Sequence, residues 1–251
     1  MTSTPPSTSQ RALALSYGLV CHVIFAASVG LMIFHMFFGM RYSLGTLSAP
    51  WSWLVNALLL LQFPLGHSFF LSAKGRAILN CLAPSVFARN LSTTTYVIIA
   101  SVQVFLLFNV WTFSGTLWWQ ASGVAFAILV ALYGASWLML GLAILNAGIT
   151  LQSGFLGWWS VFQNKRPVFP AMPVRGLFRL MRQPIYVAFA CTVWTVPNWT
   201  PDQLVIAVSL SAYCLIGPLF KEARFRKIYG QAFLDYQKNH PYWLPFPRKK
   251  T

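Results

Sequence analysis

The chain has 251 residues, of which 57% are hydrophobic and only 8% are charged, with a mean hydropathy of +0.61. An ordinary soluble domain carries roughly 25% charged residues, so this composition excludes one. The net charge is +15, from 18 Lys and Arg against three acids. The basic residues fall in short segments between apolar runs, which indicates a lipid bilayer rather than a nucleic acid as the partner.

Apolar segments long enough, or nearly long enough, to cross a membrane recur along the chain. A spanning helix needs about 20 mostly apolar residues. We expect spans over residues 13–38, 51–72, 93–111, 123–145, 185–198 and 203–219. The fifth is short and carries Pro197 near its end, so it either tilts, thickens at its ends or forms a tight hairpin with the sixth. The fold class predicted is an all-α polytopic membrane bundle of about six transmembrane helices.

The whole chain, 1–251, is expected to form a single integral membrane domain, because no long polar linker divides the apolar runs. Residues 1–12 are rich in Ser, Thr and Pro and are expected to be disordered. Four spans occupy 13–145, a cytoplasmic loop 146–184, and a transmembrane hairpin 185–219. The loop carries Gly and Pro residues that interrupt any regular helix, and loops of this length tend to be functional.

The tail, 220–251, begins with a segment of helical periodicity from residue 221 to residue 236. Its apolar residues follow the i, i+3, i+4, i+7 spacing of an amphipathic helix. We expect this apolar stripe to lie on the bundle or on the membrane surface. The residues of the stripe are Phe225, Ile228, Tyr229, Ala232, Phe233 and Tyr236.

The basic residues predict the orientation of the bundle. One set of alternate loops holds only Arg41, whereas the other set holds the remaining 17 of the 18 Lys and Arg residues. Short loops rich in Lys and Arg stay on the cytoplasmic side. We therefore expect an integral membrane protein with both termini cytoplasmic.

Only three acids occur, and each needs a purpose in so apolar a chain: Asp202, Glu222 and Asp235. Asp202 is expected to be a solvated turn or N-cap residue, and Asp235 a solvated helix charge. Glu222 lies at the cytoplasmic end of the sixth span. It either forms an i, i+4 ion pair with Arg226 or faces a polar cavity, where a lone carboxylate could hold a cation or the hydroxyls of a cofactor.

A second cluster enters the fifth span from the long loop. It either anchors the span on the cytoplasmic side or binds an anionic group, since Arg offers a rigid bidentate fork. Its members are Arg179, Arg182, Gln183, Pro184 and Tyr186. The histidines do not have metal-ligand spacing, so no metal site is expected.

These residues, in this order, form a pattern that resembles the isoprenylcysteine carboxyl methyltransferase superfamily. The pattern is Arg182-Gln183-Pro184-Ile185-Tyr186, a hydrophobic hairpin, Glu222, Gly230, Tyr236 and Pro245. Within the superfamily the chain is most similar to the bacterial methanethiol S-methyltransferase group and its relative nurim. The shared features there are Gly66-His67-Ser68, Thr95-Tyr96-Val97 and Trp194 to Pro197.

The resemblance implies methyl transfer from S-adenosylmethionine, at the cytoplasmic face, to a small or lipophilic nucleophile, with a thiol favoured. By the same resemblance, seven residues would bind the cofactor: Arg182, Gln183, Pro184, Tyr186, Glu222, Arg224 and Tyr236. His67 and Tyr96 would contact the substrate. The resemblance assigns no residue a catalytic role, and methyl transfer needs mainly orientation in a water-poor chamber.

The chain also departs from the family pattern. Gln183 stands where the family has His, and Lys221 and Ala223 replace the outer residues of a Glu-Glu-Arg motif, with Arg224 as the replacement for its Arg. A polar Asn-His-x-Asp cluster of the methanethiol enzymes is here Gly148-Ile149-Thr150-Leu151. These departures leave a second hypothesis open, a non-catalytic membrane protein of the nurim kind.

Overall fold

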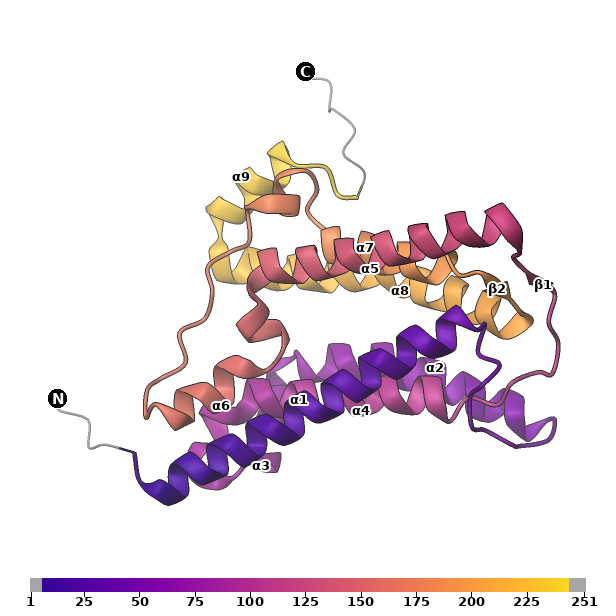
Figure 1. Ribbon diagram of the computed structural model, residues 1–251. Coiled ribbons are helices and arrows are strands. Elements are labelled where there is room, and N and C mark those ends of the chain that lie inside the picture. The colour runs from indigo at the N-terminus through magenta and orange to yellow at the C-terminus, as the bar shows by residue number, and fades with distance from the viewer. Residues whose placement is uncertain (1–5, 244–251) are drawn as a thin grey trace. The chain divides into compact units, whose positions relative to one another are not determined.

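A computed structural model describes residues 6–243 of the chain and shows helices joined by connections of different lengths (Figure 1). Their contacts divide the chain into two compact units. The first unit comprises residues 1–35, 43–112 and 149–170, and the second comprises 36–42, 113–148 and 171–251. The single domain expected from the sequence stays a prediction.

The first unit is built around α4, which packs against α2, α3 and α6. Small and apolar side chains from four segments form its core where α1, α3, α4 and α6 meet: Ala14, Ala83, Leu91, Trp158 and Val161. The elements are α1 (Thr8–Phe37), α2 (Trp51–Phe70), α3 (Ala73–Leu82), the 3-10 turn η1 (Ser85–Phe87), α4 (Ala88–Asn109) and α6 (Phe155–Phe162).

The second unit is built on a hairpin of α7 and α8, which pack along each other. A two-residue ladder pairs Trp119 with Trp199 beside the hairpin turn. Helix α5 runs alongside α7 and α8 in Figure 1. The side chain of Asn146 on α5 accepts a hydrogen bond from the Leu177 N–H (2.8 Å). The elements are β1 (Trp119–Gln120), α5 (Gly123–Gln152), η2 (Gly176–Arg179), α7 (Pro184–Trp194), β2 (Asn198–Trp199), α8 (Pro201–Tyr229) and α9 (Gln231–Asn239).

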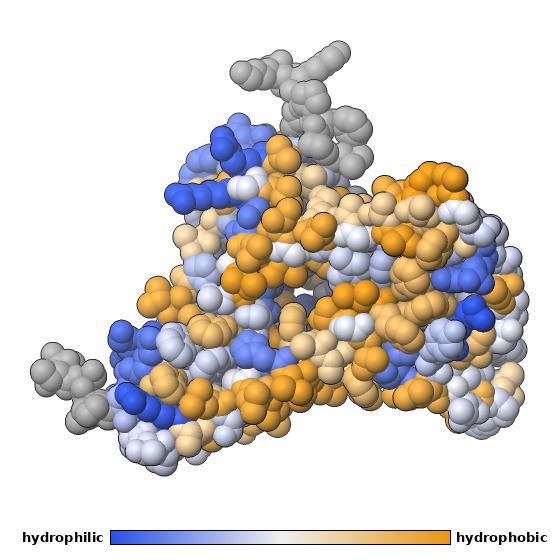
Figure 2. All heavy atoms as spheres, viewed as in Figure 1, coloured by the Kyte–Doolittle hydropathy of each residue, from blue (hydrophilic) through white to orange (hydrophobic). Residues whose placement is uncertain are grey.

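The surfaces of the long helices confirm an all-α integral membrane protein. Within residues 6–243, five helices are long and apolar enough to cross a bilayer: α1, α2, α4 with η1, α5 and α8. Large apolar side chains on α5 point outward, with Val124 77% and Leu138 72% exposed. In Figure 2 hydrophobic residues gather over α5 and along α1, whereas hydrophilic residues gather over α9. Exposing so much apolar surface to water is unfavourable, whereas the hydrocarbon core of a bilayer accommodates it.

The ends of two predicted spans differ from the structure. Helix α1 begins at Thr8, so the expectation that residues 1–12 are disordered is wrong for residues 8–12. Ser7 explains the early start, because its hydroxyl accepts the Gln10 N–H (3.2 Å) and its carbonyl accepts the Arg11 N–H. Helix α7 has only 11 residues, so it is shorter than the span predicted over 185–198 and falls below the length that crosses a bilayer.

The long loop and the tail also differ from the sequence prediction. The segment 146–184 is not free of regular helix: α5 continues to Gln152 past the non-helical Gly148, and α6 follows. Helix α8 continues through Pro218 to Tyr229, since helices that span a membrane tolerate proline where neighbouring groups satisfy the freed backbone. The predicted amphipathic helix over 221–236 is broken at Gly230, whose φ of +53° favours glycine and turns the chain into α9.

Asp202 was predicted to be solvated, and this prediction is wrong. It is 5% exposed in the first turn of α8, where Thr200 is the N-cap and accepts the Gln203 N–H (3.0 Å). The Asp202 carboxylate accepts hydrogen bonds from the N–H and the hydroxyl of Ser114. Asp235 is exposed on α9 as predicted and accepts a hydrogen bond from Gln231.

Candidate functional site

Glu222 is the centre of a buried polar cluster in the second unit. It projects from α8 and is only 2% exposed. Its Oε1 accepts hydrogen bonds from Arg182 Nε (2.9 Å) and Gln183 Nε2 (2.8 Å), which stand where the chain enters α7. Its Oε2 accepts one from Gln237 Nε2 (2.8 Å) on α9. A buried carboxylate needs such donors, since removing it from water without them costs several kcal/mol.

Arg182 joins three parts of the second unit. It is 7% exposed, and beyond Glu222 its Nη1 donates to the backbone carbonyls of Gln237 and His240, both at 2.8 Å. The Arg182 N–H donates to the carbonyl of Pro241 (2.9 Å). The guanidinium therefore holds the end of α9 and the chain after it against the start of α7.

Both alternatives weighed for Glu222 are present, with unequal geometry. The i, i+4 partner Arg226 lies 3.9 Å from Oε2 and its side chain is 50% exposed, so water screens this pair. The buried Arg182 pair is 1 Å shorter. Glu222 therefore belongs chiefly to the buried cluster.

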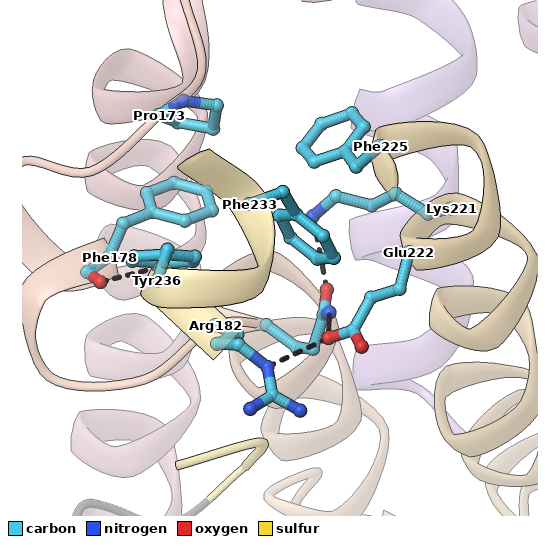
Figure 3. Close-up of a pocket in the computed structure, with 9 residues that line it drawn as sticks. Pro173, Phe178, Arg182, Lys221, Glu222, Phe225, Phe233 and Tyr236 are labelled. Carbon is cyan, nitrogen blue, oxygen red and sulfur yellow. Dashed lines mark hydrogen bonds and ion pairs between the residues drawn. The ribbon is translucent and has the colours of Figure 1, made fainter. Parts of the chain in front are cut away.

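Lys221 points into the same pocket from α8 (Figure 3). Its Nζ donates to Gln183 Oε1 (3.0 Å). The same nitrogen lies over the rings of Phe225 at 5.4 Å, Phe178 at 5.5 Å and Tyr186 at 5.7 Å from the centroids. An ammonium at these distances is attracted by the negative face of each ring.

Tyr236 forms the wall of the pocket on α9. Its hydroxyl donates to the carbonyl of Phe178 (2.7 Å), which fixes α9 against η2. Burial raises the pKa of the Tyr236 phenol to about 12; the Arg182 guanidinium opposes this shift and the Glu222 carboxylate adds to it. The phenol is therefore a neutral donor at physiological pH.

The pocket is closed by its own side chains. Arg182 and Glu222 point toward each other in Figure 3, and Phe233 and Tyr236 line the pocket from α9. The cavity left between the lining residues is about 10 Å³, space for at most one water molecule. The residues of the lining are Pro173, Phe178, Arg182, Gln183, Lys221, Glu222, Phe225, Phe233 and Tyr236.

The charges of this lining do not balance. Two cations, Arg182 and Lys221, face one carboxylate, Glu222, and aromatic rings make up most of the remaining surface. The pocket therefore offers hydrogen-bonding groups for hydroxyls and amines, positive charge for a carboxylate, and ring faces for a planar or cationic group.

The structure brings most of the predicted cofactor residues together. Arg182, Gln183, Glu222 and Tyr236 line the pocket; Pro184 is the buried first residue of α7, and Tyr186 faces Lys221. Arg224 is not part of the lining, and Arg226 rather than Arg224 approaches Glu222. Pro245 of the resemblance lies outside the described residues.

The predicted substrate residues form a pair in the first unit. Tyr96 on α4 and His67 on α2 share a hydrogen bond of 2.7 Å between the Tyr96 hydroxyl and His67 Nε2. Their rings are tilted with centroids 5.2 Å apart. The pair is partly buried, and a hydroxyl and an imidazole together can donate to and accept from a small polar ligand.

Sequence reasoning missed several members of the pocket. Gln237 and the carbonyl of His240 come from α9 and the residue after it, 15 and 18 positions beyond Glu222, and no local spacing connects them. Lys221 was noted only as a departure from the family pattern. Its aromatic neighbours Phe178 and Phe225 lie in different elements, so only the amphipathic stripe containing Phe225 gave a signal.

Comparison with known proteins gives relatives of one kind. A methanethiol S-methyltransferase of Pseudomonas deceptionensis is 29% identical over 209 residues, which cover 80% of this chain and 76% of the relative. That of Mycobacterium tuberculosis is 25% identical over 255 residues, covering 96% of this chain and all of the relative. That of a Pseudomonas species is 25% identical over 235 residues, or 92% and 89% of the two chains. No family model matches the chain, and no solved structure matches it.

The fold and these relatives define the class of this protein as a polytopic membrane methyltransferase. Such an enzyme requires a methyl donor and a methyl acceptor. Among methyltransferases, the chain is similar over most of its length to bacterial methanethiol S-methyltransferases, which confirms the predicted resemblance.

Proposed function

We propose that the protein transfers a methyl group from S-adenosylmethionine to a small thiol such as methanethiol. The observation that carries the proposal is the buried cluster around Glu222, in which a carboxylate, two amides and a guanidinium adjoin a wall of aromatic rings. The names of the relatives support a thiol acceptor.

The chemistry of this lining suits the methyl donor. The ring faces of Phe178, Tyr186 and Phe225 already surround one cation, the Lys221 ammonium, so they suit a second monocation such as a sulfonium. Glu222, Gln183 and Gln237 would hold hydroxyl and amino groups, and Arg182 or Lys221 a carboxylate. When bound, the donor would supply an electrophilic methyl group.

The residues of the pocket would mainly bind, orient and exclude water. Phe225, Phe233 and Tyr236 form an apolar cover, and a dry chamber strengthens every electrostatic contact inside it. Orientation alone supplies a large part of the barrier reduction for a displacement at carbon. Because the present cavity is about 10 Å³, α9 and the segment around Pro173 must move outward for a donor to enter.

The first test is binding of S-adenosylmethionine to the detergent-purified protein, measured by calorimetry or with radiolabelled ligand. Glu222→Gln should weaken binding about tenfold or more, because the neutral amide accepts fewer and weaker hydrogen bonds. Asp235→Asn is the matched control, since it removes the same charge from an exposed position. An unchanged affinity in a folded Glu222→Gln protein would remove Glu222 from the site.

A second variant separates ligand binding from anchoring at Arg182. Arg182→Lys keeps the charge but loses the fork that reaches Glu222 and two carbonyls. Binding of S-adenosylmethionine should weaken in this variant. Wild-type affinity would return Arg182 to the role of an anchor at the start of α7.

For the acceptor, we propose that His67 and Tyr96 contact the thiol. Tyr96→Phe removes the hydroxyl that bonds His67 and should raise KM for methanethiol, followed as dimethyl sulfide formed, without changing the affinity for S-adenosylmethionine. An unchanged KM would confine this pair to helix packing between α2 and α4.

A second candidate function follows from the closed pocket. Arg182, Gln183, Glu222 and Gln237 satisfy one another, which also suits a clasp in a non-catalytic membrane protein of the nurim kind. The same binding measurement discriminates the two. If the folded wild-type protein binds neither S-adenosylmethionine nor S-adenosylhomocysteine, the non-catalytic function becomes the better one.

We also propose that the protein lies in a bacterial inner membrane, since its relatives come from bacteria, with both termini in the cytoplasm, as the distribution of Lys and Arg indicates. Fusions to the C-terminus test this directly. A fluorescent protein should fold and an alkaline phosphatase should stay inactive; the reverse pattern would invert the topology.

A further inference from the structure

Lys221 is held in a way that differs from every other basic residue of the pocket. Ring faces from three elements surround its Nζ: Phe178 from η2, Tyr186 from α7 and Phe225 from α8, at 5.4 to 5.7 Å from the centroids. Arg182, by contrast, is held chiefly by a carboxylate and two carbonyls, and one ring, that of Tyr242, lies over its guanidinium at 5.4 Å. Lys221 therefore occupies an aromatic cage, the arrangement that binds alkylated cations in many proteins.

The cage attracts a cation through its ring faces but provides few hydrogen-bond acceptors. An ammonium has three donors, and the bond recorded within the described residues goes to Gln183 Oε1 (3.0 Å). The neighbouring carboxylate of Glu222 already accepts from Arg182, Gln183 and Gln237. A site that attracts charge through ring faces suits a sulfonium at least as well, because a sulfonium has no N–H to satisfy.

We propose that Lys221 is a specificity-determining residue: its ammonium occupies the subsite for the donor's sulfonium and competes with it from within the chain. The inference rests on the proposed function. Its consequence is that the wild-type pocket discriminates against a sulfonium ligand and in favour of the neutral thioether product, S-adenosylhomocysteine. Two like charges cannot share one cage of this size, so Lys221 must leave it for the donor to bind.

A different role for Lys221 makes a different prediction. The ammonium could instead pair with the carboxylate of the ligand's amino-acid part. S-adenosylmethionine and S-adenosylhomocysteine share that carboxylate and differ in the methyl group and its positive charge. The ratio of their dissociation constants therefore reports on the sulfonium subsite alone.

The experiment measures both dissociation constants for the wild type, Lys221→Met and the control Lys227→Met. Methionine keeps the length of lysine without its charge, and Lys227 is an exposed lysine of the same helix. In Lys221→Met the affinity for S-adenosylmethionine should rise about tenfold relative to S-adenosylhomocysteine, with no change of the ratio in Lys227→Met. An equal weakening of both ligands in Lys221→Met would overturn the proposal and make Lys221 a partner of the carboxylate. An unchanged ratio would also overturn it.

A second probe does not depend on the donor. Lys221→Ala opens the cage, and trimethylsulfonium should then raise the melting temperature of this variant, compared with sodium at the same ionic strength. The wild type and Lys227→Ala should show no such difference. If neither the wild type nor any variant binds S-adenosylmethionine or S-adenosylhomocysteine, the proposed function fails. The trimethylsulfonium result then tests the sulfonium subsite by itself: stabilisation of Lys221→Ala supports the subsite, and equal melting temperatures overturn it.

Discussion

The two ends of α8 each bury an acid, and they stabilise it by different means. At the N-terminal end Asp202 accepts hydrogen bonds from the N–H and hydroxyl of Ser114, in a helix turn whose dipole favours negative charge. Near the C-terminal end the dipole gives Glu222 no such help, and its carboxylate lies against the Arg182 guanidinium and two amides. The first arrangement is sufficient to stabilise the start of a helix. The second brings charged groups and hydrogen-bond donors together in one pocket.

This difference is the reason why we propose a functional role for Glu222 and a structural role for Asp202. A helix start can be stabilised by a residue such as Thr200, so a buried acid there needs no ligand to explain it. A buried ion pair with surplus positive charge and a wall of aromatic rings adds little net stability, because desolvation offsets its Coulomb attraction. The burial of this pair near the C-terminal end of α8 therefore supports our proposal of a binding site there.

The largest effect should come from Glu222→Gln. The substitution leaves the Arg182 guanidinium buried without its carboxylate, which should lower the free energy of unfolding by about 3 kcal/mol. Unfolding of the detergent-solubilised protein, titrated with a denaturant, measures the change. Asp235→Asn should have almost no effect. Equal stability of Glu222→Gln and wild type would show that the buried pair at the C-terminal end of α8 does not differ in stabilisation from an exposed acid.

A smaller effect is expected at the other end. Asp202→Asn keeps the size of the side chain but weakens the two bonds from Ser114, which should cost about 1.5 kcal/mol. Ligand binding should not change, because Asp202 is not part of the pocket lining. Loss of S-adenosylmethionine binding in this variant, measured as for Glu222→Gln, would show that the two ends are not functionally distinct.

Tyr236→Phe should have the smallest effect and sharpen the description of the Glu222 end. It removes one buried hydrogen bond to the Phe178 carbonyl, worth about 1 kcal/mol. Folding raises the pKa of the phenol from 10.0 to about 12. The neutral phenol therefore contributes to the free energy of unfolding below pH 10, and this contribution is lost as the pH rises toward 12. Stability measured against pH should therefore fall more steeply over this range for wild type than for Tyr236→Phe. Parallel curves would contradict the raised pKa.

Much of the fold follows from local sequence. The spans over 51–72 and 123–145 begin at the residues where α2 and α5 begin, because a run of apolar residues of bilayer length reads directly from composition. The ends of the helices were harder to predict. Ser7 starts α1 before the apolar run, Pro218 does not end α8, and Gly230 does, and these outcomes depend on capping and backbone conformation rather than hydropathy.

The candidate site was predictable in its members but not in its contacts. Arg182, Gln183, Glu222 and Tyr236 were named from a motif, and the structure places all four around one cavity. That Arg182 pairs with Glu222 rather than facing outward was not predictable, since 40 residues separate them. Lys221 in its aromatic cage was equally hidden, because its three rings come from three elements.

The sequence by itself determined the solvent, the helical class and the family resemblance of this protein, because hydropathy, charge distribution and short motifs are local properties of the chain. Only the tertiary structure decided that Arg182 and Glu222 pair in the interior of the second unit and that a lysine fills the cage beside them. Burial brings together side chains distant in sequence, and in a low-dielectric interior each buried charge must find its partner among whatever the packing places within reach.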